Sequence, residues 1–285
     1  MKRCKILFFI FSIVLVSFSI SESAEDLVEQ VGSGSINWTD GIIVATGIGA
    51  PPEQYYGKPN ARPMALQAAK IDALRKMLEV VNGVRINSTT VVKNFAVDND
   101  TVVSEVQGLI KGAKVVNQQY MSDGTVEVKV ELNMRDQFAQ IMLPDDIKDI
   151  PSVTPTEPAS NNVSTTPNVL TSGKYTGLVV DARGLKAKPA MSPKILDENK
   201  QEVYGSSSVD REYAVKQGLC GYAKDIVSAK KNERVAGSPL VVKGIKVDGA
   251  GKSDIIISNA DANILKNSSD NASIMQQCRV MIVVD

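Results

Sequence analysis

The stretch that decides the fold of the amino-terminal half runs from Ala45 to Gly83 and reads ATGIGAPPEQYYGKPNARPMALQAAKIDALRKMLEVVNG. It joins a strand-like end, which carries Gly47 and Gly49, to a long helical segment. Many phosphate-binding sites begin with a glycine loop between a strand and a helix. Here, however, Pro52 stands where a third small residue should be, and the helix begins about ten residues later. The sequence therefore predicts a strand end and a surface loop instead of a phosphate site.

The helical segment has apolar side chains at spacings of three and four, which predicts one packed face and one solvated face. The packed face is expected to hold Met64, Ala68, Ile71, Leu74, Leu78 and Val81, and the solvated face Gln67, Lys70, Arg75, Lys76 and Glu79. Pro63 suits a first helical turn, and Asn82-Gly83 suits a left-handed residue that ends the helix.

Two further patterns complete the first unit. Residues 99–112 predict a shorter helix, whose apolar positions are Val102, Val103, Val106 and Ile110. Residues 113–122 and 125–134 flank Asp123-Gly124, which is a strong signal for a two-residue hairpin turn. The order is β-α-α-β-β, so we expect helices packed on one face of a small antiparallel sheet.

The second half of the chain also predicts a mixed α+β unit. Strands are expected within 175–184, 239–247, 253–258 and 278–285, together with a hairpin within 193–205 that turns across Asp197 to Lys200. Residues 210–232 look broadly helical, with a break at Gly218 and Gly221. Asn259 is expected to cap a helix that runs to about Leu265.

The chain begins with the basic segment MKRCK, which precedes an uncharged apolar run from Ile6 to Ile20. This is the layout of a secretory signal peptide, which we place at 1–24. The alternative is an uncleaved anchor, although the run is short against the ~20 residues that span a bilayer. A stretch rich in Pro, Ser, Thr and Asn predicts a linker at 149–172, between domains at 30–148 and 173–285.

Composition excludes several classes of activity. The 32 basic and 32 acidic residues balance, so nothing draws the chain to nucleic acid, and the absence of His excludes His-dependent zinc sites and Ser-His or Cys-His nucleophiles. Three acidic pairs could bind a cation or act as paired acids: Asp145-Asp146, Asp98 with Asp100, and Asp197-Glu198. Because all lie in polar turns or the linker, we expect no catalytic, metal or cofactor site from them.

Two other groups of residues stand out. In an exported chain, Cys220 and Cys278 are a candidate disulfide, with two separate buried thiols as the alternative. Tyr55 and Tyr56 lie between prolines and glycines, where a rigid loop can expose contact residues, although such aromatics also pack back onto their own helix. At the end of a strand, Asp181-Ala182-Arg183 is the most site-like charged group of the second half, and a surface ion pair explains it equally well.

Residues 36–134 resemble a known family. GIIVATGIGAPP, ARPMALQAAKIDALRKMLEVVNGV, VSEVQGLIKGAKVV and GTVEVKVEL are similar to the Lpp-twenty lipoproteins and to the related amino-terminal domain of the flagellar assembly protein FlgT. The resemblance implies an envelope protein that associates with other envelope or flagellar components, and it carries over no catalytic residue. Members of the first family are often lipid-anchored, whereas this chain has no cysteine at the expected cleavage point. If the chain lies near the outer membrane, we therefore expect it to do so without a lipid anchor. The second half looks like uncharacterised exported bacterial proteins.

These observations predict an exported, periplasmic or envelope-located, non-enzymatic interaction or assembly module. Its expected partners are envelope or flagellar proteins, or a second copy of itself. The alternative is a periplasmic binding module for a small ligand or a cell-wall polymer, with Tyr55 and Tyr56 as contacts. An enzyme that uses carboxylates or a Ser-Lys pair is a third hypothesis, for which no residue spacing can be cited.

Overall fold

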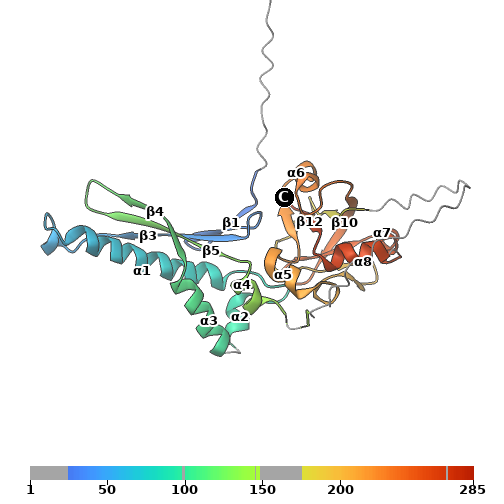
Figure 1. The fold of residues 1–285 in the computed structure, drawn as a ribbon, viewed down its shortest axis with the longest axis horizontal. Coiled ribbons are helices and arrows are strands. Elements are labelled where there is room, and N and C mark those ends of the chain that lie inside the picture. The colour runs from blue at the N-terminus through green and yellow to red at the C-terminus, as the bar shows by residue number, and fades with distance from the viewer. Residues whose placement is uncertain (1–24, 98–99, 145, 148–174, 268) are drawn as a thin grey trace, which may run out of the picture.

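Two sheets, each with its own helices, make up the computed structural model shown in Figure 1. It describes residues 25–97, 100–144, 146–147, 175–267 and 269–285. We call the described residues up to 147 the first unit and those from 175 the second unit. The predicted α+β class is confirmed, whereas the predicted leader at 1–24 and linker at 149–172 lie outside the described residues.

The first sheet has the strand order β1-β2-β3-β5-β4, and all neighbouring strands are antiparallel. Its strands are β1 (Val28–Val31), β2 (Gly34–Asn37), β3 (Ile42–Gly49), β4 (Lys114–Tyr120) and β5 (Val126–Asn133). The hairpin at Asp123-Gly124 is confirmed, with Gly124 at a φ of 85°. The β1–β2 hairpin was not predicted, because its strands are short and their turn, at Gly32, follows a polar segment.

Helix α1 (Ala61–Asn82) lies directly on β3, and small residues on both elements let the two backbones touch. A Cβ atom added to Gly47 would lie 2.1 Å from the Ala73 nitrogen, and one added to Gly49 would lie 2.3 Å from the Ala65 carbonyl oxygen. The helix buries Ala65, Ala69, Ala73, Met77, Val80 and Val81. Glycine in the strand is therefore a packing requirement, not a loop signal.

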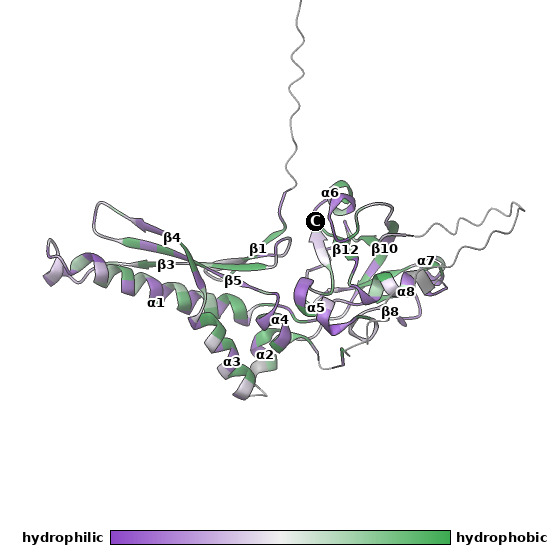
Figure 2. Cartoon of the chain, in the orientation of Figure 1, coloured by the Kyte–Doolittle hydropathy of each residue, from purple (hydrophilic) through white to green (hydrophobic). Residues whose placement is uncertain are grey.

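The predicted packing face of α1 is right in part: Val81 is buried and Leu74 and Leu78 pack against the core, but Met64, Ala68 and Ile71 are exposed. Ile71 is 61% exposed and Met64 is also exposed, while Leu74 and Leu78 are only half-buried. The alanine stripe packs instead because its small side chains allow the closest approach to the glycines of β3. Apolar residues thus lie on two sides of the helix, and hydrophobic colour recurs along its length in Figure 2.

Polar side chains of α1 also cover part of an open strand edge. Strand β2 pairs with β3 only as far as Ala45, so the following backbone groups of β3 have no strand beside them on that side. The Asp72 carboxylate accepts a hydrogen bond from the Ile48 N–H at 3.0 Å, and the Lys76 ammonium donates to the Thr46 carbonyl at 3.1 Å. These bonds satisfy groups that could otherwise pair with another strand.

The remaining helices of the first unit close the lower end of its core. They are α2 (Val92–Val97), α3 (Asp100–Lys111) and α4 (Gln137–Met142). Helix α3 buries Val102, Val106 and Ile110, as predicted, and Val103 is half-buried. The end of α1 differs from the prediction, because Gly83 has a φ of −87° and is not left-handed.

The second sheet mixes parallel and antiparallel neighbours in the order β8-β7-β11-β10-β6-β12-β9. Its strands are β6 (Leu178–Asp181), β7 (Ile195–Leu196), β8 (Glu202–Tyr204), β9 (Gly221–Ala223), β10 (Leu240–Asp248), β11 (Asp254–Ile257) and β12 (Val280–Val283). Its helices are α5 (Arg211–Gln217), α6 (Ile226–Lys231), α7 (Asn259–Lys266) and α8 (Ser269–Gln276). The hairpin at Asp197–Lys200 and the terminal strand are confirmed.

Two details of the second unit differ from expectation. The segment predicted to be broadly helical contains β9 between α5 and α6, and this strand pairs with β12. Helix α7 is capped by Ser258, whose hydroxyl accepts the Asp261 N–H, and not by Asn259. Burial on the sheet prevails over helical periodicity for the short segment around Tyr222.

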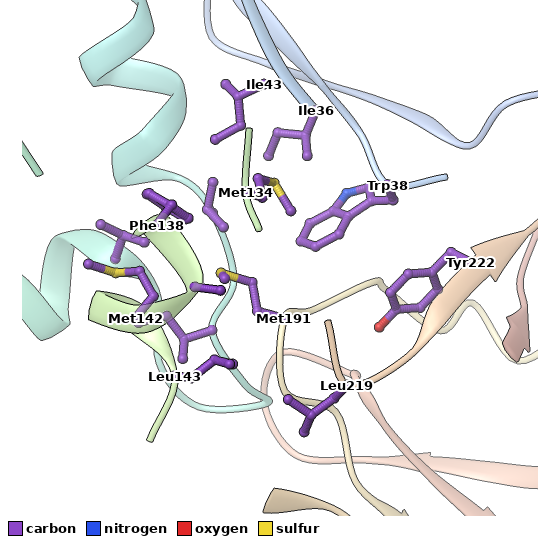
Figure 3. Packing of buried hydrophobic residues seen from close by; sticks show 14 of the residues in the cluster. Ile36, Trp38, Ile43, Met134, Phe138, Met142, Leu143, Met191, Leu219 and Tyr222 are labelled. Atoms are coloured by element: carbon purple, nitrogen blue, oxygen red, sulfur yellow. The ribbon is translucent and has the colours of Figure 1, made fainter. Parts of the chain in front are cut away.

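The two units share one apolar core. A single cluster of buried side chains runs from Ile36, Trp38 and Ile43 of the first sheet to Leu219 and Tyr222 of the second unit (Figure 3). Main-chain hydrogen bonds also cross the junction: the amide groups of residues 191 and 192 donate to the carbonyl groups of residues 85 and 86. The units are therefore fused side by side through their cores.

We expect Gly47→Val to destabilise the chain by about 3 kcal/mol or more, because the new side chain must push α1 away from β3. Urea unfolding followed by circular dichroism measures the loss. Gly108→Ala is the control: nothing lies within 4 Å of its added Cβ, so a gain of up to ~1 kcal/mol is expected from helix propensity. Equal effects of the two substitutions would contradict the packing argument.

Candidate functional site

The space over the glycines of β3 holds no ligand site, because the backbone of α1 fills it. Gly47 and Gly49 face the amide and carbonyl groups of the alanine stripe, and helix α1 starts only at Ala61. A phosphate could not approach their N–H groups without displacing the helix. The site must therefore be sought elsewhere, and three places qualify: the junction between the units, the thiols beside it, and the distal end of the first unit.

Arg85, just after α1, is the centre of the junction. Its Nε donates to the Pro189 carbonyl of the second unit at 2.7 Å, and its Nη1 donates to the Glu29 carboxylate at 2.9 Å. The guanidinium also lies 5.7 Å from the centre of the Trp38 ring. One cation thus joins β1, the residue after β2 and the second unit through hydrogen bonds and a cation–π contact.

Glu29 is held ionised by these neighbours. Burial alone would raise the pKa of its carboxyl group, but the hydrogen bonds and charge of Arg85, with the Trp38 indole N–H at 2.9 Å, outweigh burial and lower it. The carboxylate therefore carries its charge through the ordinary range of pH. It serves to orient Arg85 and Trp38, with no proton to exchange near neutrality.

Tyr222 faces this group from the second unit. Its ring meets Trp38 edge to face, with centroids 5.8 Å apart and planes at 71°. Its hydroxyl group accepts from the Ala190 N–H at 2.9 Å and donates to the Ala190 carbonyl at 2.8 Å. Burial raises the pKa of the hydroxyl well above its usual value, so it stays protonated and structural.

Ser88 makes a further polar contact across the junction. Its hydroxyl donates to the Asp254 carboxylate at 2.5 Å, and this bond is buried. Gly249 and Gly251 of the β10–β11 turn lie so close that an added Cβ would come within 2.5 Å and 2.9 Å of Ser88 atoms. The turn between β10 and β11 is thus also a docking element for the first unit.

Beside the Trp38–Tyr222 contact the junction leaves a cavity of about 50 Å³, with Met134, Met191 and Cys220 also among its walls. This volume holds a few waters or a small apolar group, far below the usual pocket for a drug-sized ligand. A wider polar cleft of about 450 Å³ opens beside it, lined by Thr39, Asp40, Arg135, Gln217, Gly221, Asn232, Glu233 and Arg234. Its lining includes two arginines and two acids, so it could contact a zwitterionic or polar group.

Cys220 and Cys278 lie near Arg234, beside the junction, and both are free thiols in this structure. Burial raises the pKa of the Cys220 thiol to about 11 and that of the Cys278 thiol to about 12. Arg234 donates to the carbonyl groups of Gly218 and Cys278 and ties the two segments together. The predicted disulfide is not formed here, and its formation after export stays a prediction.

The acidic pairs have structural partners where they are described. Asp197 accepts from the Asn199 and Gln201 amides and pairs with Lys266 at 3.0 Å. Glu198 is hydrogen-bonded to the start of α7, and Asp181 holds Arg183 in a bidentate pair. Asp98 and Asp145 lie outside the described residues. In the parts of the chain that the structure covers, no cluster of three metal-ligating side chains occurs.

Tyr55 and Tyr56 lie at the far end of the first unit, near the start of α1 (Figure 1). Tyr55 belongs to the short 3-10 helix η1 (Glu53–Tyr55), is half-buried, and has the Lys58 ammonium 5.5 Å from its ring centre. Tyr56 is 54% exposed. Tyr55 therefore has a partner within its own chain, whereas Tyr56 faces solvent and is available as a contact residue.

Other apolar side chains are exposed at this end, which we call the distal tip: Ile48, Tyr56, Met64 and Met121. Ile48 and Met121 are brought there by the pairing of β3, β4 and β5, and Met64 by the first turn of α1. Sequence periodicity assigned Met64 to the core and made no prediction for Ile48 or Met121. The glycine spacing on β3 was the signal that could have shown which helix face packs.

One comparison with known proteins gives a match. Residues 177–285 match a family model described as the second domain of Treponema pallidum Tp0624. The match covers the second unit and leaves the first unit unassigned. A search of curated proteins finds no match to the chain.

Within the residues that the structure covers, every helix is too short or too polar to cross a bilayer.

Glu29→Gln should lower the free energy of unfolding by about 2 kcal/mol near pH 7, because the charge-assisted bonds to Arg85 are lost. The lowered pKa of Glu29 makes this contribution present above the ordinary carboxyl pKa of 4.5, and it is lost as pH falls through the folded-state value. The gap in Tm between variant and wild type should therefore shrink below that pH. Glu212→Gln, in an exposed pair with Lys216, is the control and should cost under ~0.5 kcal/mol.

The folded protein should react with iodoacetamide at pH 8 at least about a hundredfold more slowly than the unfolded protein, because burial keeps both thiols protonated. Mass spectrometry after timed labelling measures the rate at Cys220 and Cys278 separately. Labelling in denaturant without reductant confirms free thiols, whereas labelling only after reduction shows that the disulfide forms. Rapid labelling of the folded, reduced chain would contradict the burial argument.

Proposed function

We propose that this chain is an exported, non-enzymatic interaction module of the cell envelope, and that the distal tip is its partner-binding surface. The observation that carries the proposal is the exposure of Ile48, Tyr56, Met64 and Met121 at one end of a well-packed unit. Tyrosine and methionine are enriched in the centres of protein interfaces, and such side chains exposed together at one end usually mark a contact site.

The rest of the first unit supports this role. The tip is presented by two strands and a helix that are held together by close backbone packing, so its side chains are positioned before a partner arrives. A binding surface that is ordered in advance loses little conformational entropy on association. The junction with the second unit lies at the opposite end and leaves the tip free (Figure 1).

Location and partners are part of the proposal. The signal peptide expected at 1–24 supports export to the periplasm or envelope. The resemblance of residues 36–134 to the Lpp-twenty lipoproteins and to FlgT supports envelope or flagellar proteins as partners. The matched domain in the second unit is known by its source protein and brings no activity with it.

A photocrosslinking residue placed at Tyr56 should capture a discrete envelope protein in intact cells. Capture should fall at least about tenfold when Met64→Ser is added to the same chain, because truncating a central apolar contact costs more than about 1.4 kcal/mol. Mass spectrometry identifies the captured protein and also reports the first residue of the mature chain.

Val227 supplies the matched control, since it is 62% exposed but lies on α6 of the second unit. The same crosslinker at Val227 should not capture that protein, and Val227→Ser should leave capture at Tyr56 unchanged. Equal capture from both positions, or capture that Met64→Ser leaves intact, would overturn the assignment of the tip.

A second candidate function is the binding of a small ligand in the cleft between the units. The cavity at Trp38 and the polar groups of Arg135 and Glu233 beside it favour this alternative. Thermal shift with amino acids and cell-wall fragments tests it: a ligand of this site should raise Tm, and Arg135→Ala should abolish that rise. A ligand effect that survives Arg135→Ala would place binding elsewhere.

A further inference from the structure

The free edge of the first sheet is β4. It ends the strand order, and among the described elements β5 is the one that packs extensively against it. All of its residues except Val115 are exposed. Figure 1 shows the β4–β5 hairpin extending away from the second unit along the upper side of the sheet.

The other exposed strand edges of the first sheet are partly blocked, whereas most of β4 is open. Asp72 and Lys76 bond to the open part of β3, and β1 is a short strand whose Glu29 is engaged at the junction. On β4, only Lys114 and a bulge between Val115 and Asn117 hinder pairing with another strand. The run from Asn117 to Met121 beyond the bulge contains no charge and no proline. Natural sheets rarely leave such an edge open unless it pairs.

The backbone groups that face outward on this edge can be assigned. The Met121 N–H donates to the Thr125 carbonyl across the hairpin at 2.8 Å. Antiparallel ladders alternate bonded and non-bonded pairs, so Gln119 and Asn117 are also in pairs bonded to β5. The N–H and C=O groups of Gln118 and Tyr120 consequently point away from β5.

We propose that two copies of this chain pair antiparallel through β4, with the two-fold axis at Gln119. The inference extends the proposed function by naming a second copy as one partner. In this register Gln118 of one copy faces Tyr120 of the other, and each offers the outward N–H and C=O that the other needs. Pairing uses the whole regular run between the bulge and the turn, and it joins the two first sheets into one.

Side chains fit this register without opposing like charges. Gln119 pairs with Glu127 of β5 and so lies on the face away from α1, where it meets its own copy. Tyr120 pairs with buried Val126, on the α1 face, and meets Gln118 of the other copy. Lys114 lies outside the paired run. An amide-rich, uncharged strand presents no charge that would favour a different partner, and its side chains are compatible with those of a second copy.

Gln119→Cys tests the register directly. Non-bonded antiparallel pairs hold their Cα atoms about 4.5 Å apart, within reach of a disulfide, so two copies should crosslink through this position with oxidised glutathione. Glu127→Cys lies on the same face but one strand inward, and it is the control. We expect the Gln119→Cys dimer to form at least about tenfold faster, and the raised pKa of both native thiols keeps them unreactive near neutral pH.

Light scattering of the mature chain at about 100 µM measures pairing without a crosslink, because association depends on concentration. Gln118→Pro removes an N–H that β5 does not use, so it should give a folded monomer. Gln119→Lys and Gln119→Glu should each be monomeric and should pair when mixed, as opposite charges then meet.

The proposal is overturned by a wild-type monomer at that concentration, or by equal crosslinking of the two cysteine variants. Met121 belongs to both surfaces, but Tyr56 and Met64 lie outside β4, so capture at Tyr56 and pairing through β4 are separate measurements. Loss of tip capture with pairing intact refutes the proposed function alone. Loss of pairing with tip capture intact refutes only the dimer.

Discussion

The contact between the backbones of α1 and β3 is the constraint on which the rest of the structure depends. Gly47 and Gly49 admit the alanine stripe of the helix to within touching distance, and this fixes the rotation of α1. That rotation turns Asp72 and Lys76 toward the open part of β3 and turns Ile71 to solvent. Close packing of small residues thus determines both what the helix buries and what it exposes.

The junction follows from the same helix. Where α1 ends, the chain places Arg85 and Ser88 against the second unit, so this one segment supplies a guanidinium contact and a buried hydroxyl contact to that unit. Removing one partner from such a group leaves the other unsatisfied, which is why these side chains hold the units together more specifically than apolar contact alone would. Trp38 and Tyr222 complete the junction with an aromatic contact.

Sequence patterns predicted the α+β class and most strands, because alternation and turn residues such as Asp123-Gly124 are local signals. They failed where tertiary packing decides. Periodicity favoured the larger apolar residues of α1 over its alanines, and helix spacing concealed β9 around Tyr222. The junction could not be predicted, since neither Arg85 nor Ser88 differs in sequence context from an ordinary loop residue. For the candidate site, the sequence indicated Tyr56 but not Ile48 or Met121, whose exposure depends on strand register.

The hydrogen bonds from α1 to β3 also limit how many molecules a sheet can join. A sheet that offers two open edges can grow without end, as fibrils do, because each added copy presents a new edge. Here Asp72 and Lys76 occupy backbone groups of β3 that β2 leaves uncovered, so that part of β3 is closed to a further strand. An assembly through one self-complementary edge closes on itself and has a finite stoichiometry. If the chain pairs through β4 as proposed, these two side chains keep the uncovered part of β3 from adding a further strand.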